Sequence, residues 1–272
     1  VSSSPAAEWG HMVLDEVLQP IGVDSFFKNY WNRKPLLIKG ARQKFEMLPG
    51  VVELPRLAGG LVDGRTWEEG ENSYCNAYRV AQDGEAEQVN NVPADVRARM
   101  FNAGYTLCFG DVSFADSVLS ELVYSATNLC AFRAATLVTC YLSPPNSRGI
   151  VHYDAQHVFF IQRSGAKHWR ISERPGKVHP ISNFVFSSAS ADMLEAMTTA
   201  GYAIKSPIEC GFVDFRLGEG DLLYLPPGYY HLPHTTDDHS FHYTLTLGPV
   251  AFRDFFLEAV NGLLWKNSEY LN

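Results

Sequence analysis

The second half of the chain is a succession of short β-type runs. From about residue 132, apolar and β-branched stretches alternate with turns rich in Gly, Pro or Ser: "FRAATLVTCYLSPP", "HVFFIQRSG", "KHWRIS", "GFVDFRLGEGDLLYLPPG" and "FHYTLTLG". Short runs with this punctuation favour a β-rich fold with many turns over a helical bundle. We therefore predict a β-barrel or double-stranded β-helix over residues 132–248, interrupted by one helix in "SSASADMLEAMTTAGY".

The flanking segments have a different pattern. Residues 1–131 contain several helical patterns, of which "VPADVRARMFNAG" and "DVSFADSVLSELVYSATNL" are the clearest, and a hairpin pattern around Asp83-Gly84. "LPRLAGGLVDG" also has a helical pattern. We expect this mixed, partly helical part to pack on the barrel. Residues 249–272 have an apolar helical stripe, so we expect a C-terminal helix that either covers the barrel or forms a homodimer.

The composition of the chain excludes some classes of protein and favours others. With 272 residues and 46% hydrophobic content, the chain can bury one large core. The formal charge of −8 argues against direct binding of nucleic acid and is compatible with a basic peptide or protein as partner. The five cysteines are odd in number and form no CxxC pair. Together with the lack of a signal peptide or membrane-length apolar run, they predict a soluble cytoplasmic protein with reduced thiols.

Two ionisable residues, His152 and Asp154, stand in an otherwise strand-like run. They are two positions apart, so their side chains point to the same side of a strand. Such a pair is most often simply hydrogen-bonded, but buried ionisable groups need partners. A shared divalent metal would satisfy both, so we interpret them as two corners of a metal site.

A third ligand should come from another strand, and His231 in "GDLLYLPPGYYHLPH" is the best candidate. It follows a short strand and a rigid Pro-Pro-Gly turn, and His234 is the runner-up. Two histidines and a carboxylate leave one face of an octahedral ion open, as in non-haem Fe(II) oxygenases. His157 has the opposite strand parity, so we expect it behind the ligands or at the surface.

Lys167 follows the turn "RSGA". If residues 158–162 and 167–171 form a hairpin, alternation places Lys167, Trp169 and Ile171 on the inward face. A lysine there could pair with the distal carboxylate of a dicarboxylate cosubstrate. Taken alone, a lysine that extends its amine to water at the barrel rim is the simpler interpretation.

The ordered motifs "HYD", "VFFIQRSGAKHWRI", "GDLLYLPPGYYH" and "FHYTLTLG" resemble the JmjC-type cupin oxygenases, in particular the ribosomal oxygenases, and "NYWNRKPLLIKGA" is similar to the segment that leads into their catalytic domain. The resemblance extends over about residues 24–250. It implies a jelly-roll (cupin) barrel and a dioxygenase dependent on Fe(II), 2-oxoglutarate and O2.

The resemblance also implies roles for individual residues. The metal ligands would be His152, Asp154 and His231. Lys167, fifteen positions after His152, would bind the C5 carboxylate of 2-oxoglutarate. Ser143 matches a position that often lends a hydroxyl to the cosubstrate, and His242 matches a polar position near the metal.

The substrate is less constrained than the chemistry. Ribosomal oxygenases carry a dimerisation segment and a winged helix after the barrel, whereas about 22 residues follow Val250 here, so we expect no winged helix. The predicted reaction is hydroxylation of an unactivated C–H in an amino-acid side chain of a protein or peptide. The alternatives are hydroxylation of a small molecule or natural-product precursor, demethylation of methyl-lysine, and a non-catalytic metal-binding cupin.

Overall fold

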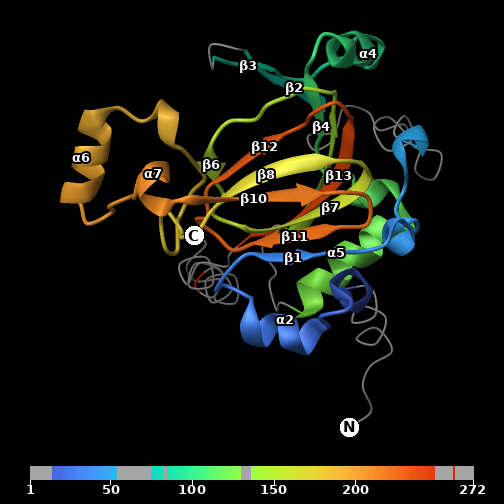
Figure 1. The fold of residues 1–272 in the computed structure, drawn as a ribbon, viewed down its shortest axis with the longest axis horizontal. Helices are drawn as coiled ribbons and strands as arrows, with labels where there is room; N and C mark the ends of the chain where they lie inside the picture. Colours follow the sequence, from blue (N-terminus) through green and yellow to red (C-terminus); the bar gives the residue numbers. More distant parts are fainter. Residues whose placement is uncertain (1–13, 54–74, 82–84, 130–135, 249–259, 261–272) are drawn as a thin grey trace, which may run out of the picture.

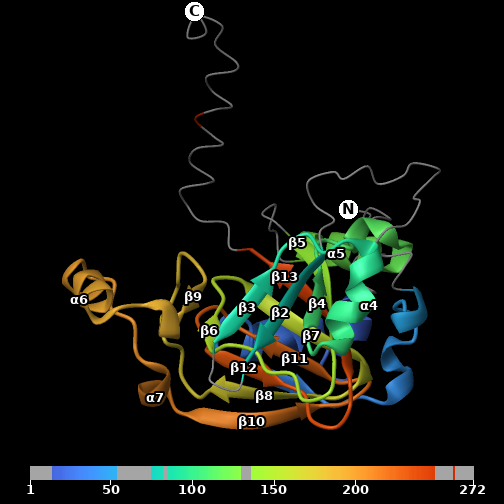
Figure 2. The ribbon, with the colours of Figure 1, turned by 90° about the horizontal axis from the view of Figure 1, so that it is seen from above.

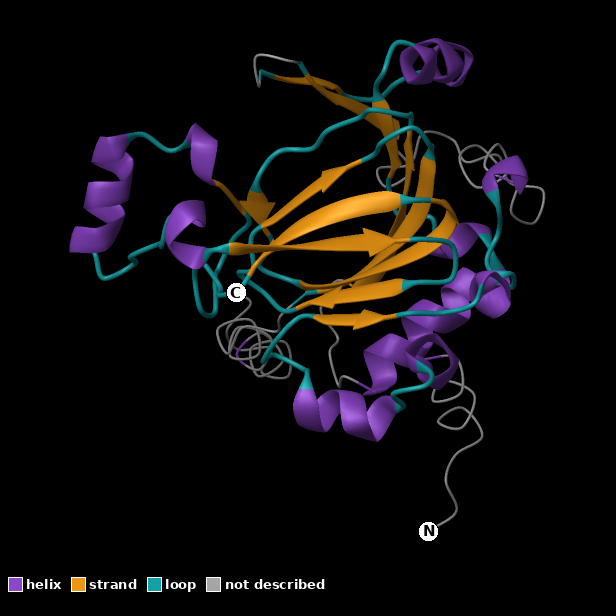
Figure 3. Cartoon of the chain, viewed as in Figure 1, coloured by secondary structure: helices purple, strands orange, loops and turns teal. Residues whose placement is uncertain are grey.

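The structure is a computed structural model whose described residues are 14–53, 75–81, 85–129, 136–248 and 260; two antiparallel sheets form its centre (Figures 1 and 3). The larger sheet contains β1 (Leu36–Ile38), β2 (Cys75–Val80), β3 (Ala86–Val89), β4 (Thr106–Phe109), β5 (Thr136–Ser143), β7 (His157–Gly165), β11 (Leu222–Leu225) and β13 (Ser240–Leu247). The smaller contains β6 (His152–Tyr153), β8 (Lys167–Ser172), β9 (Phe184–Val185), β10 (Phe212–Leu217) and β12 (His231–His234). Their spatial orders are β1-β11-β7-β13-β5-β4-β2-β3 and β10-β8-β12-β6-β9.

The chain alternates between the two sheets. The order β11-β7-β13-β5 in the larger sheet faces β10-β8-β12-β6 in the smaller, which is the arrangement of a double-stranded β-helix. The predicted mainly β fold of this type is confirmed. The run "VFFI" in β7 has no polar residue because both of its faces are covered: Phe159 and Ile161 pack into the main core, while Val158 and Phe160 face the smaller sheet.

The hairpin between residues 158–162 and 167–171, on which the placement of Lys167 was conditional, does not form. β7 pairs with β11 and β13, whereas β8 pairs with β10 and β12 in the other sheet. The chain crosses between the sheets at Gly165, whose φ is +66°, and a Cβ there would collide with the His239 carbonyl oxygen. The expected alternation nevertheless holds, because Lys167 and Trp169 are buried while Arg170 is exposed.

The N-terminal part extends the larger sheet. The predicted hairpin is present as β2 and β3, and β4 joins β2 to β5. The helices of this part include α2 (Val23–Asn29), α4 (Ala94–Asn102) and α5 (Ser117–Leu129). The apolar stripe of α5, with Leu119 and Leu122 fully buried, packs against β5 and β13 and seals one side of the main core (Figure 2).

An insertion between β8 and β10 projects from the sheets (Figures 1 and 2). It contains β9, the predicted helix, α6 (Ala191–Thr199), and a short helix, α7 (Pro207–Cys210). The helices predicted over 54–64 and 249–272 lie outside the described residues, apart from residue 260. No helix in the described part of the chain is both long and apolar enough to span a membrane.

Candidate active site

His152, Asp154 and His231 converge at one end of the smaller sheet. His152 begins β6, Asp154 directly follows that strand, and His231 begins β12 as the cross-strand partner of His152. One ligand atom from each residue lies within 4.8 Å of the others. The His231 Nε2 and the Asp154 Oδ2 are 3.5 Å apart, close to the separation of about 3 Å expected for adjacent ligands with metal bonds of roughly 2 Å.

The backbone orients both imidazole rings. The Nδ1 of His152 is 3.0 Å from the Ile150 carbonyl oxygen, and the Nδ1 of His231 is 3.2 Å from that of Tyr229. If each Nδ1–H donates to its carbonyl, both Nε2 lone pairs remain available for a metal. Burial, together with the neighbouring His152, lowers the pKa of His231 to about 4, so this ring is the neutral ligand that a metal requires. These residues therefore fit a divalent metal.

Gly228, in the Pro-Pro-Gly turn, joins the two loops that carry these ligands. Its N–H donates to the Asp154 carbonyl oxygen at 2.8 Å, and its own carbonyl accepts from the Gly176 N–H at 2.9 Å. Its φ is +83°, and a Cβ would collide with the Lys177 carbonyl oxygen. The turn predicted from sequence therefore determines where Asp154 lies as well as His231.

Gly228→Ala should lower the free energy of unfolding by about 2–4 kcal/mol and weaken metal binding, because both positive φ and a backbone collision oppose the methyl group. Gly201→Ala is a matched control: its φ is +80°, but nothing lies within 4 Å of its Cβ position. The control should lose only about 1 kcal/mol. Chemical denaturation and cobalt titration measure both effects, and equal losses in the two variants would contradict this interpretation.

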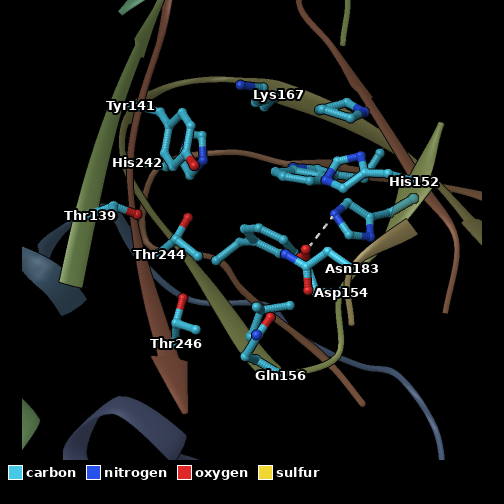
Figure 4. A pocket seen from close by; sticks show the side chains of 15 residues that line it. Thr139, Tyr141, His152, Asp154, Gln156, Lys167, Asn183, His242, Thr244 and Thr246 are labelled. Atoms are coloured by element: carbon cyan, nitrogen blue, oxygen red, sulfur yellow. Dashed lines mark ion pairs between the residues drawn. The ribbon is translucent and has the colours of Figure 1, made fainter. Parts of the chain in front are cut away.

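A cavity of about 330 Å³ separates the two sheets beside the triad (Figure 4). Both sheets and the insertion contribute to it. Its lining residues are Thr139, Tyr141, His152, Asp154, Gln156, Val158, Phe160, Lys167, Trp169, Asn183, His231, Pro233, His242, Thr244 and Thr246.

Lys167 lies at one end of this cavity and is only 4% exposed. Its Nζ donates to the Ser143 Oγ at 2.8 Å, and no carboxylate of the described residues forms an ion pair with it. Burial lowers the pKa of Lys167 to about 7. A buried amine without a counter-charge is costly, so its environment favours binding of an anion from outside the chain.

Among the described residues, three buried polar atoms around the cavity have no hydrogen-bond partner: the Trp169 Nε1, the His242 Nδ1 and the Thr244 Oγ1. His242 stacks on Tyr141 and meets the edge of Trp169. Burial, and then the nearby Lys167, hold the pKa of His242 well below its usual range, so the ring is neutral. Polar atoms left unpaired in this way indicate a place for a ligand.

Of the remaining residues considered from the sequence, some line the cavity and others lie outside it. His242 lines the cavity, whereas Ser143 supports Lys167 from behind and also contacts the Thr106 hydroxyl. His234, the runner-up ligand, stacks against His168 on the other side of the smaller sheet. His157 is a core residue that stacks on the Trp31 ring and bonds the Tyr224 hydroxyl.

Several lining residues were not predicted. Strand parity predicts most of them. Thr139 and Tyr141 have the same parity as Ser143 along β5, and Thr244 and Thr246 have the same parity as His242 along β13, so each set shares one face of its strand. Gln156 has the same parity as the "HYD" motif. Asn183 comes from the insertion and had no sequence signal.

Comparison with known proteins adds curated relatives of similar sequence. The chain is 27% identical over 262 residues to the "Bifunctional lysine-specific demethylase and histidyl-hydroxylase NO66" of Drosophila erecta, covering 91% of this chain and 35% of that protein. It is 25% identical to "Ribosomal oxygenase 2" of Mus musculus, covering 92% of this chain and 50% of that protein. The chain therefore spans about a third to a half of the length of these relatives.

Solved structures share the fold. Escherichia coli ycfD matches with a TM-score of 0.63 and 19% identity, covering 89% of this chain and 57% of that one. The same ribosomal oxygenase in complex with cobalt and 2-oxoglutarate matches with a TM-score of 0.60 and 17% identity, covering 89% and 56%. Residues 119–255, half of the chain, match the family described as the JmjC domain, and the chain therefore belongs to the JmjC domain family.

Proposed function

We propose that this protein is an Fe(II)- and 2-oxoglutarate-dependent dioxygenase that hydroxylates an amino-acid side chain in a protein or peptide. One observation carries the proposal: a cluster of two histidines and one carboxylate shares a cavity with a buried, uncompensated lysine. The cluster suits an iron with open positions, and the lysine suits the far carboxylate of a dicarboxylate cosubstrate.

Each residue then has a definite part in the reaction. His152, Asp154 and His231 would hold the iron, which when bound supplies O2 activation coupled to oxidative decarboxylation of 2-oxoglutarate. Lys167 neutralises the distal carboxylate, while the Ser143 hydroxyl fixes the direction of the amine. The rings of Phe160 and Trp169, tilted against each other with centroids 4.0 Å apart, form an apolar wall of the cavity and exclude water.

The relatives and the composition support the remaining parts of this proposal. The printed names of the relatives refer to ribosomal and histidyl or lysyl targets, which favours a protein or peptide substrate here. The charge of −8 favours a basic one. We assign the chemistry to residues 132–248 and a supporting role to residues 1–131. Four free, buried cysteines (Cys75, Cys108, Cys140 and Cys210) favour the cytoplasm.

A turnover assay tests the function. The protein with Fe(II), ascorbate, O2 and 2-oxoglutarate should form succinate, and peptides from the producing organism should gain 16 Da only when the protein is present. Mass spectrometry follows the product and chromatography the succinate. Succinate formation that stays at the level of the metal-free sample would contradict the proposal.

Cosubstrate binding should depend on pH through Lys167. Its pKa in the free protein is about 7, so above pH 7 the dicarboxylate must bind together with a proton, and its Kd should rise about tenfold per pH unit. Calorimetry with the non-decarboxylating analogue N-oxalylglycine between pH 6 and 9 measures this. Lys167→Arg, whose guanidinium stays charged, is the control and should bind with a flatter pH profile. Equal slopes would contradict the role of Lys167.

A further inference from the structure

We propose that the outer face of the smaller sheet binds an extended acidic segment of a partner protein. The surface is a row of four basic side chains: Arg216 on β10, His168 on β8, His234 on β12 and Arg148 in the loop before β6. We call it the basic row. None of its members lines the cavity, so the inference does not depend on the proposed function.

Strand pairing places the four residues side by side. His168 is the cross-strand partner of Arg216 on one side and of His234 on the other. An isolated β-bridge places Arg148 opposite His234. Residues directly opposite one another share a face of the sheet, and the rings of His168 and His234 stack with their centroids 5.1 Å apart. With neighbouring strands about 4.8 Å apart, the row is about 14 Å long.

The basic row points away from the cavity. Along β8 and β12 its histidines alternate with Trp169 and Pro233, which line the cavity from the other face of the sheet. In Figures 1 and 2 the smaller sheet forms one outer layer of the protein, and no described helix lies over its outer face. Arg148 and Arg216 are exposed, and the two histidines are half-buried. A partner can therefore reach the row without entering the cavity.

Nearby carboxylates do not neutralise the row. Within the described part of the chain, no carboxylate forms an ion pair with any of its four members. Asp214, on the same face, is 3.4 Å from the Nε of Arg170, and Asp221 pairs with Lys39. The whole chain has 30 acidic residues against 22 lysines and arginines, so composition does not explain a row without a carboxylate. Like charges that face one another across strands are destabilising, so an anion from outside the chain would offset their repulsion.

The side chains of the row suit carboxylates. The guanidinium groups of Arg148 and Arg216 offer N–H donors and no acceptor, in a fork that matches a carboxylate or a phosphate. Burial, and then the neighbouring His168, lower the pKa of His234, so this ring is neutral at pH 7 and contributes an N–H donor. The row can therefore hold several acidic groups at once, with the arginines at its two ends.

Length and charge favour a peptide over a nucleic acid. Along an extended peptide, the side chains of one face repeat about every 6.6 Å, so carboxylates at three alternate positions span about 13 Å, close to the length of the row. A nucleic acid carries a negative charge at every nucleotide and would be repelled by a protein whose formal charge is −8. A short acidic segment brings its few charges only to the row.

Fluorescence anisotropy with labelled peptides tests the inference. One peptide carries glutamate at three alternate positions with serine between them, and a matched peptide carries glutamine instead. At low ionic strength the glutamate peptide should bind about tenfold more tightly or better, through ion pairs that glutamine cannot form. Equal affinities would overturn the inference. Tighter binding of a short oligouridine than of the glutamate peptide would also overturn it, because the surface would then suit a nucleic acid.

Variants assign the binding to the row. The double variant Arg148→Gln/Arg216→Gln should bind the glutamate peptide about tenfold more weakly, as expected for the loss of two exposed ion pairs. The control is Arg33→Gln/Arg99→Gln, which removes the same charge from two exposed positions outside the row and should keep the affinity. Far-UV circular dichroism checks that both variants are folded. Equal weakening in the two would mean that net charge alone determines binding, against the inference.

Competition excludes the other basic group that an acidic peptide could reach. Lys167 lies in the cavity, on the opposite face of the sheet from the row. A saturating amount of cobalt and N-oxalylglycine should therefore leave the affinity for the glutamate peptide unchanged. Displacement of the peptide by N-oxalylglycine would place it in the cavity and show that the basic row is not its binding site.

Discussion

Asp154→Ala should lower both cobalt affinity and succinate formation more than about 100-fold, because loss of a direct ligand exceeds the 10–100-fold cost of losing a residue behind one. The fold should survive, since the Asp154 carbonyl that accepts from Gly228 belongs to the backbone and is kept. Metal titration, succinate formation and the far-UV circular dichroism spectrum measure the three properties.

Asp214→Ala provides the matched control. Asp214 lies on β10 in the same smaller sheet, but its side chain is 74% exposed and absent from the cavity lining. Removing it should change neither metal affinity nor turnover. An Asp154→Ala protein that binds cobalt as tightly as this control would show that the triad is not the metal site.

Lys167→Met should strongly weaken dicarboxylate binding and at the same time stabilise the protein without ligand. Truncating one partner of a desolvated charge pair costs about 2–5 kcal/mol, so the Kd for 2-oxoglutarate should rise about 30-fold to several thousand-fold. The free energy of unfolding should rise by about 1–4 kcal/mol, because a buried amine without a counter-charge is replaced by an apolar chain of similar length.

The pH dependence of this stabilisation has a definite sign. The pKa of Lys167 is about 7 in the folded protein, against 10.5 for an unperturbed lysine, so the unfolded chain binds more protons between these limits. The cost of the buried charge is therefore fully present below pH 7 and lost as the pH approaches 10.5. The advantage of Lys167→Met should shrink over that window.

Denaturation at several pH values, with and without N-oxalylglycine, tests both halves of this prediction. Lys205→Met, at an exposed position in the insertion, is the control and should keep binding and stability unchanged. A Lys167→Met protein that is less stable than this control at pH 6 would contradict the prediction and mean that the hydrogen bond to Ser143 outweighs the cost of burying the charge.

The sequence predicted the site best where the two-residue spacing of a strand is combined with a recognisable turn. The two-residue spacing in "HYD" placed His152 and Asp154 on one side of a strand, and the Pro-Pro-Gly turn pointed to His231; the structure brings these three together. Which strands pair with one another was harder to predict from the sequence. Lys167 and Trp169 face inward as alternation required, but through a crossing at Gly165 rather than a hairpin, because pairing depends on distant strands.

Parts of the site depend on contacts far apart in the sequence. The role of Ser143 as support for Lys167 requires knowing that β5 ends beside the start of β8. Asn183 reaches the cavity from an insertion whose path no local pattern predicts. His157 was ambiguous for the same reason, since its stacking partner, Trp31, belongs to the N-terminal part.

The pairing of His152 with His231 across two strands has a mechanical consequence. β6 and β9 are only two residues long, so few backbone hydrogen bonds hold them at the edge of the smaller sheet. A metal ion bound by both histidines would act as a cross-link between β6 and β12. Through β9 it would also steady Asn183, so that removing the metal should speed hydrogen exchange at this edge before it affects the core.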